Sequence, residues 1–162
     1  MNTSPRLGVK ALIVRDGMVL MNRMRDGASG EIYYAAPGGG QEHGEDQREA
    51  LRRECREEIG AEVEVYQVAC IHEFMSRTRR ADGTPREDLF HQVNVNYWCG
   101  LAPGQEPGQV PPTDPDPGQD GTEWLPIDRL GEYWVVPETL SQWLRSDPSG
   151  RDIYLGVTQR EM

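Results

Sequence analysis

The sequence predicts a single domain of the α+β class, and three observations support this prediction. Runs of β-branched and aliphatic residues recur along the chain, which is typical of strands. Two segments have the apolar spacing of amphipathic helices, and one of them follows a glycine-rich turn. The length of 162 residues suits one hydrophobic core, and no apolar run approaches the length of a membrane-spanning helix.

The first elements are expected to form an antiparallel hairpin. Residues 1–6 are predicted to be an N-terminal tail. Residues 9–14 and 18–24 are rich in aliphatic and β-branched side chains, so we expect two strands there. Asp16 and Gly17 between them predict a tight turn, because both residues readily adopt positive φ.

The next elements lead into a glycine-rich turn and a helix. Residues 32–36 predict a short strand that delivers the chain to the glycines at 38–40. These glycines permit positive φ and a close approach of the backbone to a metal ion or a phosphate. The helix is expected to begin near Glu45 or Asp46, where acidic groups suit the positive end of the helix dipole. Gly60 is a natural residue for its end.

The middle of the chain is expected to hold two strands and two loops. Residues 62–73 and 91–101 carry apolar side chains in strand-like patterns. Residues 77–88 are polar and contain Gly and Pro, which predicts a loop between the two strands. Residues 103–121 are rich in Pro, Gly and acidic residues, which favours either a mobile lid or a disordered insertion.

The C-terminal part is expected to contain one more strand and a second helix. Residues 122–127 predict a short strand, followed by a helical turn through Gly131. Residues 139–144 predict a helix whose apolar side chains face the core. Residues 146–162 are treated as a C-terminal extension, in which 153–157 either add a last strand or trail off.

Three carboxylates lie close together on the first helix. Glu54, Glu57 and Glu58 have the i, i+3, i+4 spacing that places side chains on one face. A neighbouring apolar stripe, which can pack on the core, consists of Leu51, Cys55 and Ile59. Like charges at this spacing repel, so a hard divalent cation is the simplest group to hold them. The alternative is a solvated helix in which Arg53 forms ion pairs with its neighbours.

The complete pattern of this stretch decides between the two interpretations. The stretch reads GGGQEHGEDQREALRRECREEIGA, in which Gly39 is followed after five residues by Glu45 and after seven more by residues 53–60. This arrangement resembles the signature of the Nudix hydrolases, the MutT-like family, with the Nudix box at residues 39–61.

Two positions depart from the family pattern. The family usually has bulky aliphatic residues where Cys55 and Ala61 stand. A buried cysteine behaves as a small hydrophobic residue, so these departures concern packing and leave the carboxylate geometry unchanged.

The resemblance implies a fold and an activity. The fold is a Nudix-type α/β/α sandwich with a central mixed β-sheet, which we expect over residues 7–145. The activity is a pyrophosphohydrolase that depends on Mg²⁺ or Mn²⁺ and cleaves a diphosphate linkage in a nucleoside diphosphate joined to another moiety. The alternative is a Nudix-type sensor domain that binds a nucleotide without turnover, although its acidic residues would then be free to change.

The resemblance also implies roles for the residues of the box. Glu57 and Glu58 are expected to bind the metal, together with Glu54 as a third ligand or as the base that orients water. A backbone carbonyl of the glycine turn, near Gly38, is expected to complete the ligand set. Arg53, Glu54 and Glu57 form the predicted catalytic group, in which Arg53 holds a carboxylate in place.

The general base stays open between the helix and the acidic loop. In this family it lies either in the box or on a separate loop. Glu106, Asp114, Asp116 and Asp120 all lie on the loop, and we favour Asp116 and Asp120 as its candidates for the general base.

Substrate contacts are predicted outside the box. Arg77 lies in the arginine-rich segment 77–88, where a planar guanidinium can bind two phosphate oxygens; a solvated loop is the alternative. Arg23 is a further candidate. Tyr33 and Tyr34 point to opposite faces of a strand, so one can stack on a base while the other enters the core, and Tyr34 is taken as the substrate contact.

Composition and charge limit the classes of partner and the cellular location that we expect. A net charge of −10 argues against a sequence-independent grip on nucleic acid. Three cysteines without a CxxC pair, and an N-terminus that does not resemble a secretory signal, predict reduced thiols and a cytoplasmic location. No membrane partner is expected. His72 and His91 are expected to be hydrogen-bonded structural residues. The oligomeric state stays open, with a homodimer as one option because many members of the family form dimers.

Overall fold

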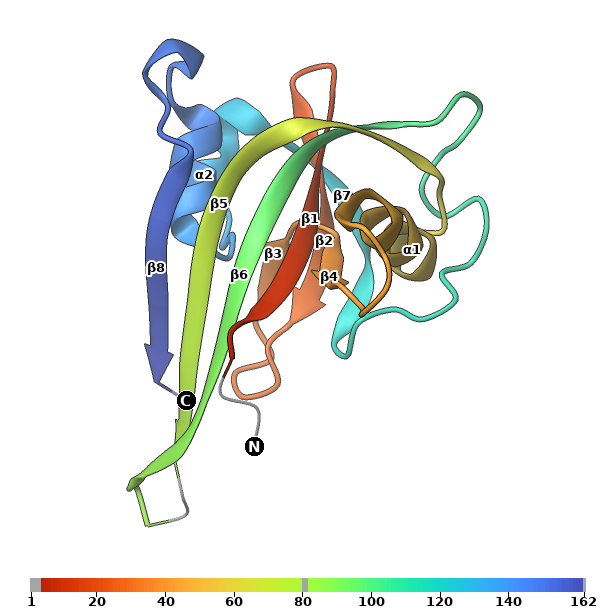
Figure 1. Ribbon diagram of the computed structural model, residues 1–162. Coiled ribbons are helices and arrows are strands. Elements are labelled where there is room, and N and C mark those ends of the chain that lie inside the picture. The colour runs from red at the N-terminus through yellow and green to blue at the C-terminus, as the bar shows by residue number, and fades with distance from the viewer. Residues whose placement is uncertain (1–3, 80–81, 162) are drawn as a thin grey trace.

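A mixed eight-stranded sheet lies between two helices (Figure 1). This computed structural model describes residues 4–79 and 82–161. The strands are β1 (Arg6–Arg15), β2 (Met18–Arg25), β3 (Ile32–Ala35), β4 (Gly38–Gly40), β5 (Val63–Arg79), β6 (Pro85–Leu101), β7 (Gln119–Pro126) and β8 (Tyr154–Glu161). The helices are α1 (Gln47–Ile59) and α2 (Glu138–Arg145), with 3₁₀ turns at Ile127–Glu132 and Pro148–Gly150. The predicted α/β/α sandwich with a mixed sheet is confirmed.

The sheet divides into two halves that diverge from the first hairpin. The strand order is β3-β2-β1-β6-β5-β8, with β4 also paired to β1 and β7 to β2. β1 and β2 pair only beside their turn, at Val14 with Val19 and at Arg15 with Met18. Beyond that point β1 continues with β4 and β6, whereas β2 continues with β3 and β7. The separation leaves room between the two halves, and the site lies there.

The predicted hairpin turn is confirmed. Asp16 and Gly17 have φ values of 50° and 74°, and the flanking residues pair across the turn. A two-residue turn with two positive φ angles matches the right-handed twist of the strands that it joins.

Helix α1 begins and ends close to the predicted residues. Asp46 accepts a hydrogen bond from the N–H of Glu49, and the Glu49 side chain accepts one from the N–H of Asp46, which completes a capping box. At the other end Gly60 adopts the left-handed conformation with φ 62°. A Cβ at Gly60 would lie 1.9 Å from the carbonyl oxygen of Val110, so both the conformation and the packing require glycine.

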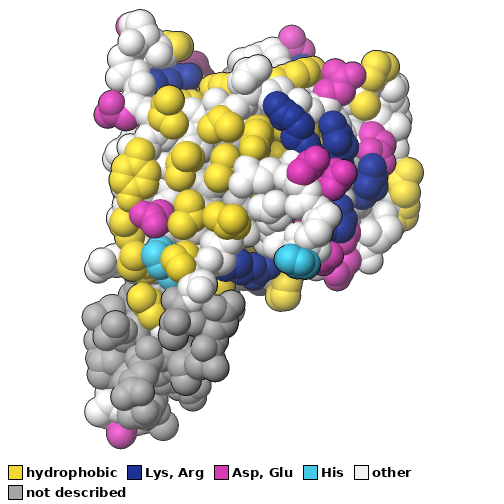
Figure 2. Space-filling model, viewed as in Figure 1, with side chains coloured by type: hydrophobic (Ala, Val, Ile, Leu, Met, Phe, Trp, Pro, Cys, Tyr) yellow, Lys and Arg dark blue, Asp and Glu magenta, His cyan; other side chains and the backbone are white. Residues whose placement is uncertain are grey.

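Two clusters of buried side chains lie on opposite faces of the sheet. On the α1 face, Leu51, Cys55 and Ile59 pack against β1, as the apolar stripe predicts. On the α2 face, Leu140, Trp143 and Leu144 pack with residues of β1, β2 and β7. Figure 2 shows charged side chains of both signs gathered over α1 and hydrophobic side chains over β5 and β8.

The prediction of a loop over residues 77–88 is wrong. β5 runs to Arg79 and β6 starts at Pro85, and the two strands pair continuously into an arm that projects from the body (Figure 1). The rings of Phe74 and Phe90 contact each other across the arm, and their centroids are 6.1 Å apart. Cross-strand pairing stabilises this arm, and local composition cannot show which residues pair.

The segment between β6 and β7 packs on the C-terminal end of α1, unlike the mobile or disordered insertion that its composition favours. The N–H groups of Gly108 and Asp114 donate to the carbonyl oxygens of Ile59 (3.1 Å) and Glu57 (3.0 Å). The Gln119 side chain donates to the carbonyl of Glu58 at 2.9 Å. The segment therefore satisfies three carbonyl groups that a helix end leaves without partners.

The C-terminal extension contains β8, which pairs in parallel with β5. In the described part of the chain, none of the helices is both long and apolar enough to cross a membrane.

Candidate active site

Arg53 occupies the centre of the acidic face of α1. Its Nε and Nη2 atoms donate to the two carboxylate oxygens of Glu45 at 3.1 and 2.7 Å. Its Nη1 atom donates to Glu54 at 3.1 Å and to Glu57 at 3.3 Å. The bond to Glu45 raises the pKa of Arg53 and lowers the pKa of Glu45. A permanently charged guanidinium thus holds three carboxylates together.

Glu54 lies against the glycine turn. Its side chain is largely buried, and this burial raises the pKa of the carboxyl group. A Cβ at Gly39 would lie 2.6 Å from the Oε1 atom of Glu54. The glycine in the turn is therefore required for the carboxylate to approach the backbone of β4.

Glu58 is the most deeply buried of the three carboxylates, with 1% of its surface exposed. Its Oε2 atom accepts hydrogen bonds from the N–H of Gly38 at 2.7 Å and from the Asn22 side chain at 3.1 Å. Its Oε1 atom is buried and has no hydrogen-bond partner among the described residues. Burial and, to a smaller extent, the neighbouring Asp116 raise the pKa of Glu58 to about 9.

The structure separates the acidic residues of the 103–121 segment. Asp114 and Asp116 line an acidic pocket of about 260 Å³ together with Arg53, Glu54 and Glu57. The other two candidates form ion pairs elsewhere: Asp120 with Arg23 and Arg25, and Glu106 with Arg15. Asp116 is therefore the better placed of the two loop candidates that the sequence suggests.

The donor set suits a hard divalent cation. Carboxylates from α1, Asp116 and the carbonyl of Gly38 are oxygen ligands of the kind that Mg²⁺ and Mn²⁺ prefer. The Gly38 carbonyl accepts a hydrogen bond from Lys10 at 3.3 Å and keeps a second lone pair. The unpartnered Oε1 atom of Glu58 is the observation that most favours a cation.

The carboxylates are not yet arranged around an ion. Among the described residues, no group of three or more His, Cys, Asp or Glu side chains stands ready to hold a metal. Arg53 takes the place of the cation, since it bonds to both Glu54 and Glu57.

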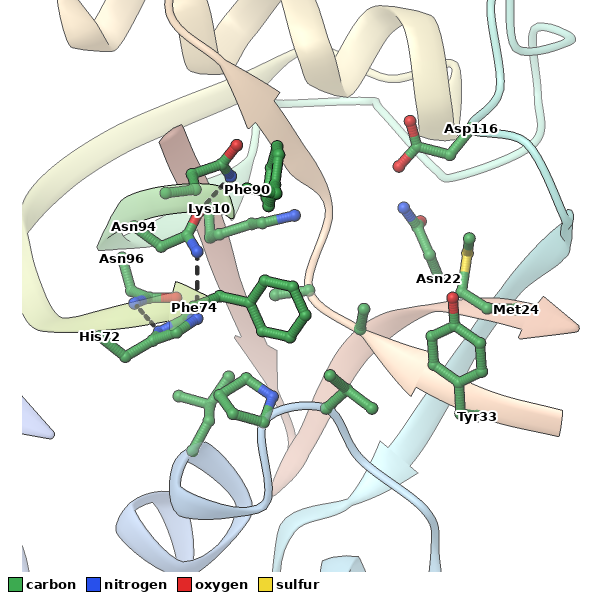
Figure 3. Close-up of a pocket in the computed structure, with 16 residues that line it drawn as sticks. Lys10, Asn22, Met24, Tyr33, His72, Phe74, Phe90, Asn94, Asn96 and Asp116 are labelled. Atoms are coloured by element: carbon green, nitrogen blue, oxygen red, sulfur yellow. Dashed lines mark hydrogen bonds between the residues drawn. The ribbon is translucent and has the colours of Figure 1, made fainter. Parts of the chain in front are cut away.

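A second cavity, of about 220 Å³, lies beside the acidic pocket, in the space between the two halves of the sheet (Figure 3). We call it the amide cavity, because four side-chain amides line it: Asn22, Gln92, Asn94 and Asn96. Its apolar walls come from Tyr33, Phe74 and Phe90, and from the segment that precedes α2. Asp116 lines both the acidic pocket and this cavity, so the two are neighbours.

The polar wall of the amide cavity is a hydrogen-bonded row on β5 and β6. His72 is buried, and its ring nitrogens lie 3.0 Å from the Asn96 amide and 3.3 Å from the Asn94 amide (Figure 3). Burial and, to a smaller extent, the charge of Lys10 lower the pKa of His72 to about 4. The ring is thus neutral at physiological pH and serves as a fixed hydrogen-bonding partner of the amides, as the sequence predicts for His72.

Asn96 presents an acceptor to the cavity. Its Nδ2 atom donates to the carbonyl of Cys70 at 3.2 Å and lies 3.0 Å from the Nδ1 atom of His72. Its Oδ1 atom is fully buried and has no partner among the described residues. A buried acceptor at a cavity wall indicates that a ligand or a water molecule completes it.

Comparison with known proteins agrees with this geometry. A family model of the NUDIX domain matches residues 4–145. The chain belongs to the Nudix family. The prediction of a Nudix hydrolase, an enzyme that cleaves phosphoanhydride bonds, is therefore confirmed. No curated protein sequence matches the chain.

Solved structures of Nudix proteins share the fold. A MutT Nudix hydrolase from Burkholderia pseudomallei is 26% identical with a TM-score of 0.52, over 77% of this chain and 85% of that one. An ADP-ribose pyrophosphatase from Streptococcus suis is 19% identical with a TM-score of 0.58, over 96% and 100% of the two chains. A UDP-X diphosphatase is 21% identical with a TM-score of 0.57, over 98% of this chain and 69% of that one.

The structure places the predicted substrate contacts outside the Nudix box in different surroundings. Tyr34 is buried in the core, where its hydroxyl donates to Glu123 at 2.6 Å, and Tyr33 lines the cavity instead. The structure thus replaces Tyr34 by Tyr33 as the aromatic residue open to a ligand. Arg23 forms an ion pair with Asp120 at 2.9 Å, outside both pockets. The side chain of Arg77 lies outside the described residues.

Sequence reasoning missed the amide row, although the pattern was visible. In β6 the amides at 92, 94 and 96 alternate with Val93, Val95 and Tyr97, so three successive positions on one face of the strand are amides. Buried amides on one strand face are uncommon without a ligand or partner. Asn22 and Lys10 offered no such pattern, because neither belongs to a row of alternating polar residues in its strand.

Proposed function

We propose that this Nudix protein is a divalent-metal-dependent pyrophosphohydrolase that acts on a nucleoside diphosphate linked to a second moiety. The observation that carries the proposal is the contact between two unlike pockets. The acidic pocket offers oxygen ligands for a cation, and the amide cavity offers aromatic walls and hydrogen-bonding groups for a planar heterocycle. Asp116 belongs to both, so a single ligand can occupy them together.

Net charge supports the need for metal. The protein carries a formal charge of −10, and a diphosphate adds negative charge to an already acidic site. When bound, Mg²⁺ or Mn²⁺ supplies charge neutralisation on the diphosphate oxygens and lowers the pKa of a bound water molecule. Glu57 and Glu58 would hold the ion, with the Gly38 carbonyl as a further ligand.

The residues of the chain have distinct roles in the proposed reaction. A water oxygen bonds to phosphorus, the bridging P–O bond breaks, and the water proton passes to a base. Glu54 is our candidate for the base, because burial raises its pKa and a raised pKa makes a carboxylate a better proton acceptor. Asp116 is the alternative on the loop. Arg53 keeps Glu54 and Glu57 in place from the side away from the amide cavity.

The named neighbours support the substrate class. One similar structure is an ADP-ribose pyrophosphatase and another is a UDP-X diphosphatase, and both names describe a nucleoside diphosphate joined to another group. The amide cavity supplies the corresponding heterocycle site in this chain.

The proposal is tested by phosphoanhydride cleavage. Purified protein is incubated with Mg²⁺ and a panel that contains ADP-ribose, UDP-glucose, CDP-choline, diadenosine tetraphosphate and the nucleoside triphosphates. We expect at least one to release a nucleoside monophosphate, with no release after chelation of the metal. Tight binding of a panel member without cleavage under any metal would instead support the sensor.

A further inference from the structure

Lys10 is the only lysine of the chain, and it lines the amide cavity near Asp116, the residue that both pockets share. It lies on β1 opposite Gly38 of β4 and is half-buried. Its side chain lines the amide cavity, and Figure 3 shows its amino group directed toward Asn22 and Asp116. Its positive charge lowers the pKa of the buried Glu58, against the larger effect of burial, and it lowers the pKa of His72 in the amide cavity in addition to the larger effect of burial.

The other cations close to the site are already occupied. Arg53 donates to Glu45, Glu54, Glu57 and the carbonyl of Gly40. Lys10 makes one long hydrogen bond, of 3.3 Å, to the Gly38 carbonyl and has no carboxylate within 4.0 Å among the described residues. It is also the only lysine or arginine, in the described part of the chain, that lines the amide cavity.

A half-buried ammonium without a carboxylate partner has lost part of its hydration without full compensation. An anionic ligand would supply that compensation. The position selects which anion: a ligand whose heterocycle lies in the amide cavity and whose reacting linkage lies by the acidic pocket must place a phosphate between them, beside Lys10. Only the phosphate attached to the nucleoside occupies that place.

We propose that Lys10 binds the phosphate on the nucleoside side of the scissile linkage. This inference rests on the proposed function for the direction in which the substrate lies. The ammonium donates to a non-bridging oxygen of that phosphate, which fixes the linkage relative to the carboxylates of α1. The competing explanation is structural, namely that Lys10 only offsets the charge of the buried Glu58.

Binding of nucleoside monophosphates and of the matching neutral nucleosides separates these explanations. Monophosphates are products and are not cleaved, so binding can be measured by calorimetry in the presence of Mg²⁺ with AMP, GMP, CMP and UMP. The variants are Lys10→Met, Lys10→Gln and Lys10→Arg. Arg129→Met is the matched control, because it removes one positive charge from an exposed pair with Glu132.

We expect Lys10→Met and Lys10→Gln to weaken monophosphate binding roughly 10- to 100-fold while nucleoside affinity stays unchanged. Lys10→Arg should retain most of the affinity, and Arg129→Met should behave as wild type. The proposal is overturned if Lys10→Met and Lys10→Gln bind the monophosphate as tightly as wild type, if they weaken nucleoside and monophosphate equally, or if wild-type protein does not prefer the monophosphate. If Lys10→Met and Lys10→Gln both fail to fold, and Lys10→Arg does not restore monophosphate affinity, the role of Lys10 is structural and the proposal is overturned.

The two proposals can fail separately. Cleavage of the substrate panel without a Lys10-dependent preference for monophosphates would overturn the role of Lys10 alone. A Lys10-dependent preference without any cleavage would overturn the hydrolase and leave the phosphate contact in place.

Discussion

The acidic pocket and the amide cavity lie side by side, but they are built in different ways. The acidic pocket takes most of its residues from one helix, at spacings of three and four, and from a loop that packs on that helix. The amide cavity takes its residues from β1, β2, β3, β5, β6 and the segment before α2. Most residues of the acidic pocket therefore come from two short stretches of sequence, whereas the amide cavity forms only when strands that are distant in sequence pack together.

This difference predicts a division of labour between the pockets. Changes in the acidic pocket should remove turnover while the fold survives, because its carboxylates are clustered at an energetic cost. Changes in the amide cavity should act on affinity and on stability, because its side chains also form the inner face of the sheet.

The largest expected effect is on turnover. Glu57→Gln and Glu58→Gln should each lower kcat by about 100-fold or more, since a neutral amide cannot replace an anionic ligand. Steady-state kinetics on the substrate identified from the panel measures this, with melting temperature as the check on folding. Glu132→Gln, on the opposite part of the surface, is the control and should retain full activity. Near-full activity in both box variants would contradict the assignment.

His72 provides a test of the amide cavity that does not depend on activity. Its pKa is depressed to about 4, so the folded state binds fewer protons than the unfolded state between that value and the ordinary value near 6.5. The stabilising contribution is complete above the ordinary pKa and is lost as pH falls through the folded pKa. The free energy of unfolding that His72 contributes differs by about 3 kcal/mol between pH values above the ordinary pKa and below the folded pKa.

Urea unfolding of wild type and His72→Gln from pH 7.5 to 4 measures this contribution. Wild type should lose stability relative to the variant as the pH falls. Parallel curves for the two proteins would show that His72 is not buried as a neutral ring.

The loop that joins the two pockets can be tested through Gln119. Its side chain donates to the Glu58 carbonyl at 2.9 Å and to Asn22 at 3.3 Å, and accepts from the N–H of Asp116 at 3.1 Å. Gln119→Leu should cost about 1–3 kcal/mol of unfolding free energy, because these partners lose their bonds. Gln109→Leu, at an exposed position of the same segment, is the control. Equal stability of both variants would indicate that the segment is not packed on α1.

How far the sequence could be read depends on the range of the interactions. The hairpin at Asp16-Gly17, the cap at Asp46 and the end of α1 at Gly60 are local, and all three were predictable from neighbouring residues. The arm of β5 and β6 was missed because its stability comes from pairing between strands, and the segment before β7 was misread because its partners are carbonyls of a helix far away in sequence.

The two tyrosines of β3 show the same limit at the level of single residues. Alternation predicts that one of Tyr33 and Tyr34 enters the core and the other faces a ligand, but it does not say which. The register of β3 with β2, which pairs Tyr34 with Arg23, decides the matter. This register depends on tertiary pairing that no short window of sequence contains.

The smallest expected effect separates these two tyrosines. Tyr33→Leu should raise KM by roughly fivefold, since an aromatic contact is worth about 1 kcal/mol, with little change in melting temperature. Tyr34→Phe should leave KM unchanged and lower stability by about 1 kcal/mol through loss of the hydrogen bond to Glu123. The reverse pattern would place Tyr34 at the substrate, as the sequence alone suggested.

Metal binding by the carboxylates of α1 is the central claim, and calorimetric titration of Mn²⁺ tests it most directly. Wild type should bind the ion, and the double variant Glu57→Gln, Glu58→Gln should bind it at least about tenfold more weakly, because two anionic ligands are lost. Equal affinity in the two proteins would show that the ion binds elsewhere and would contradict the account of the site.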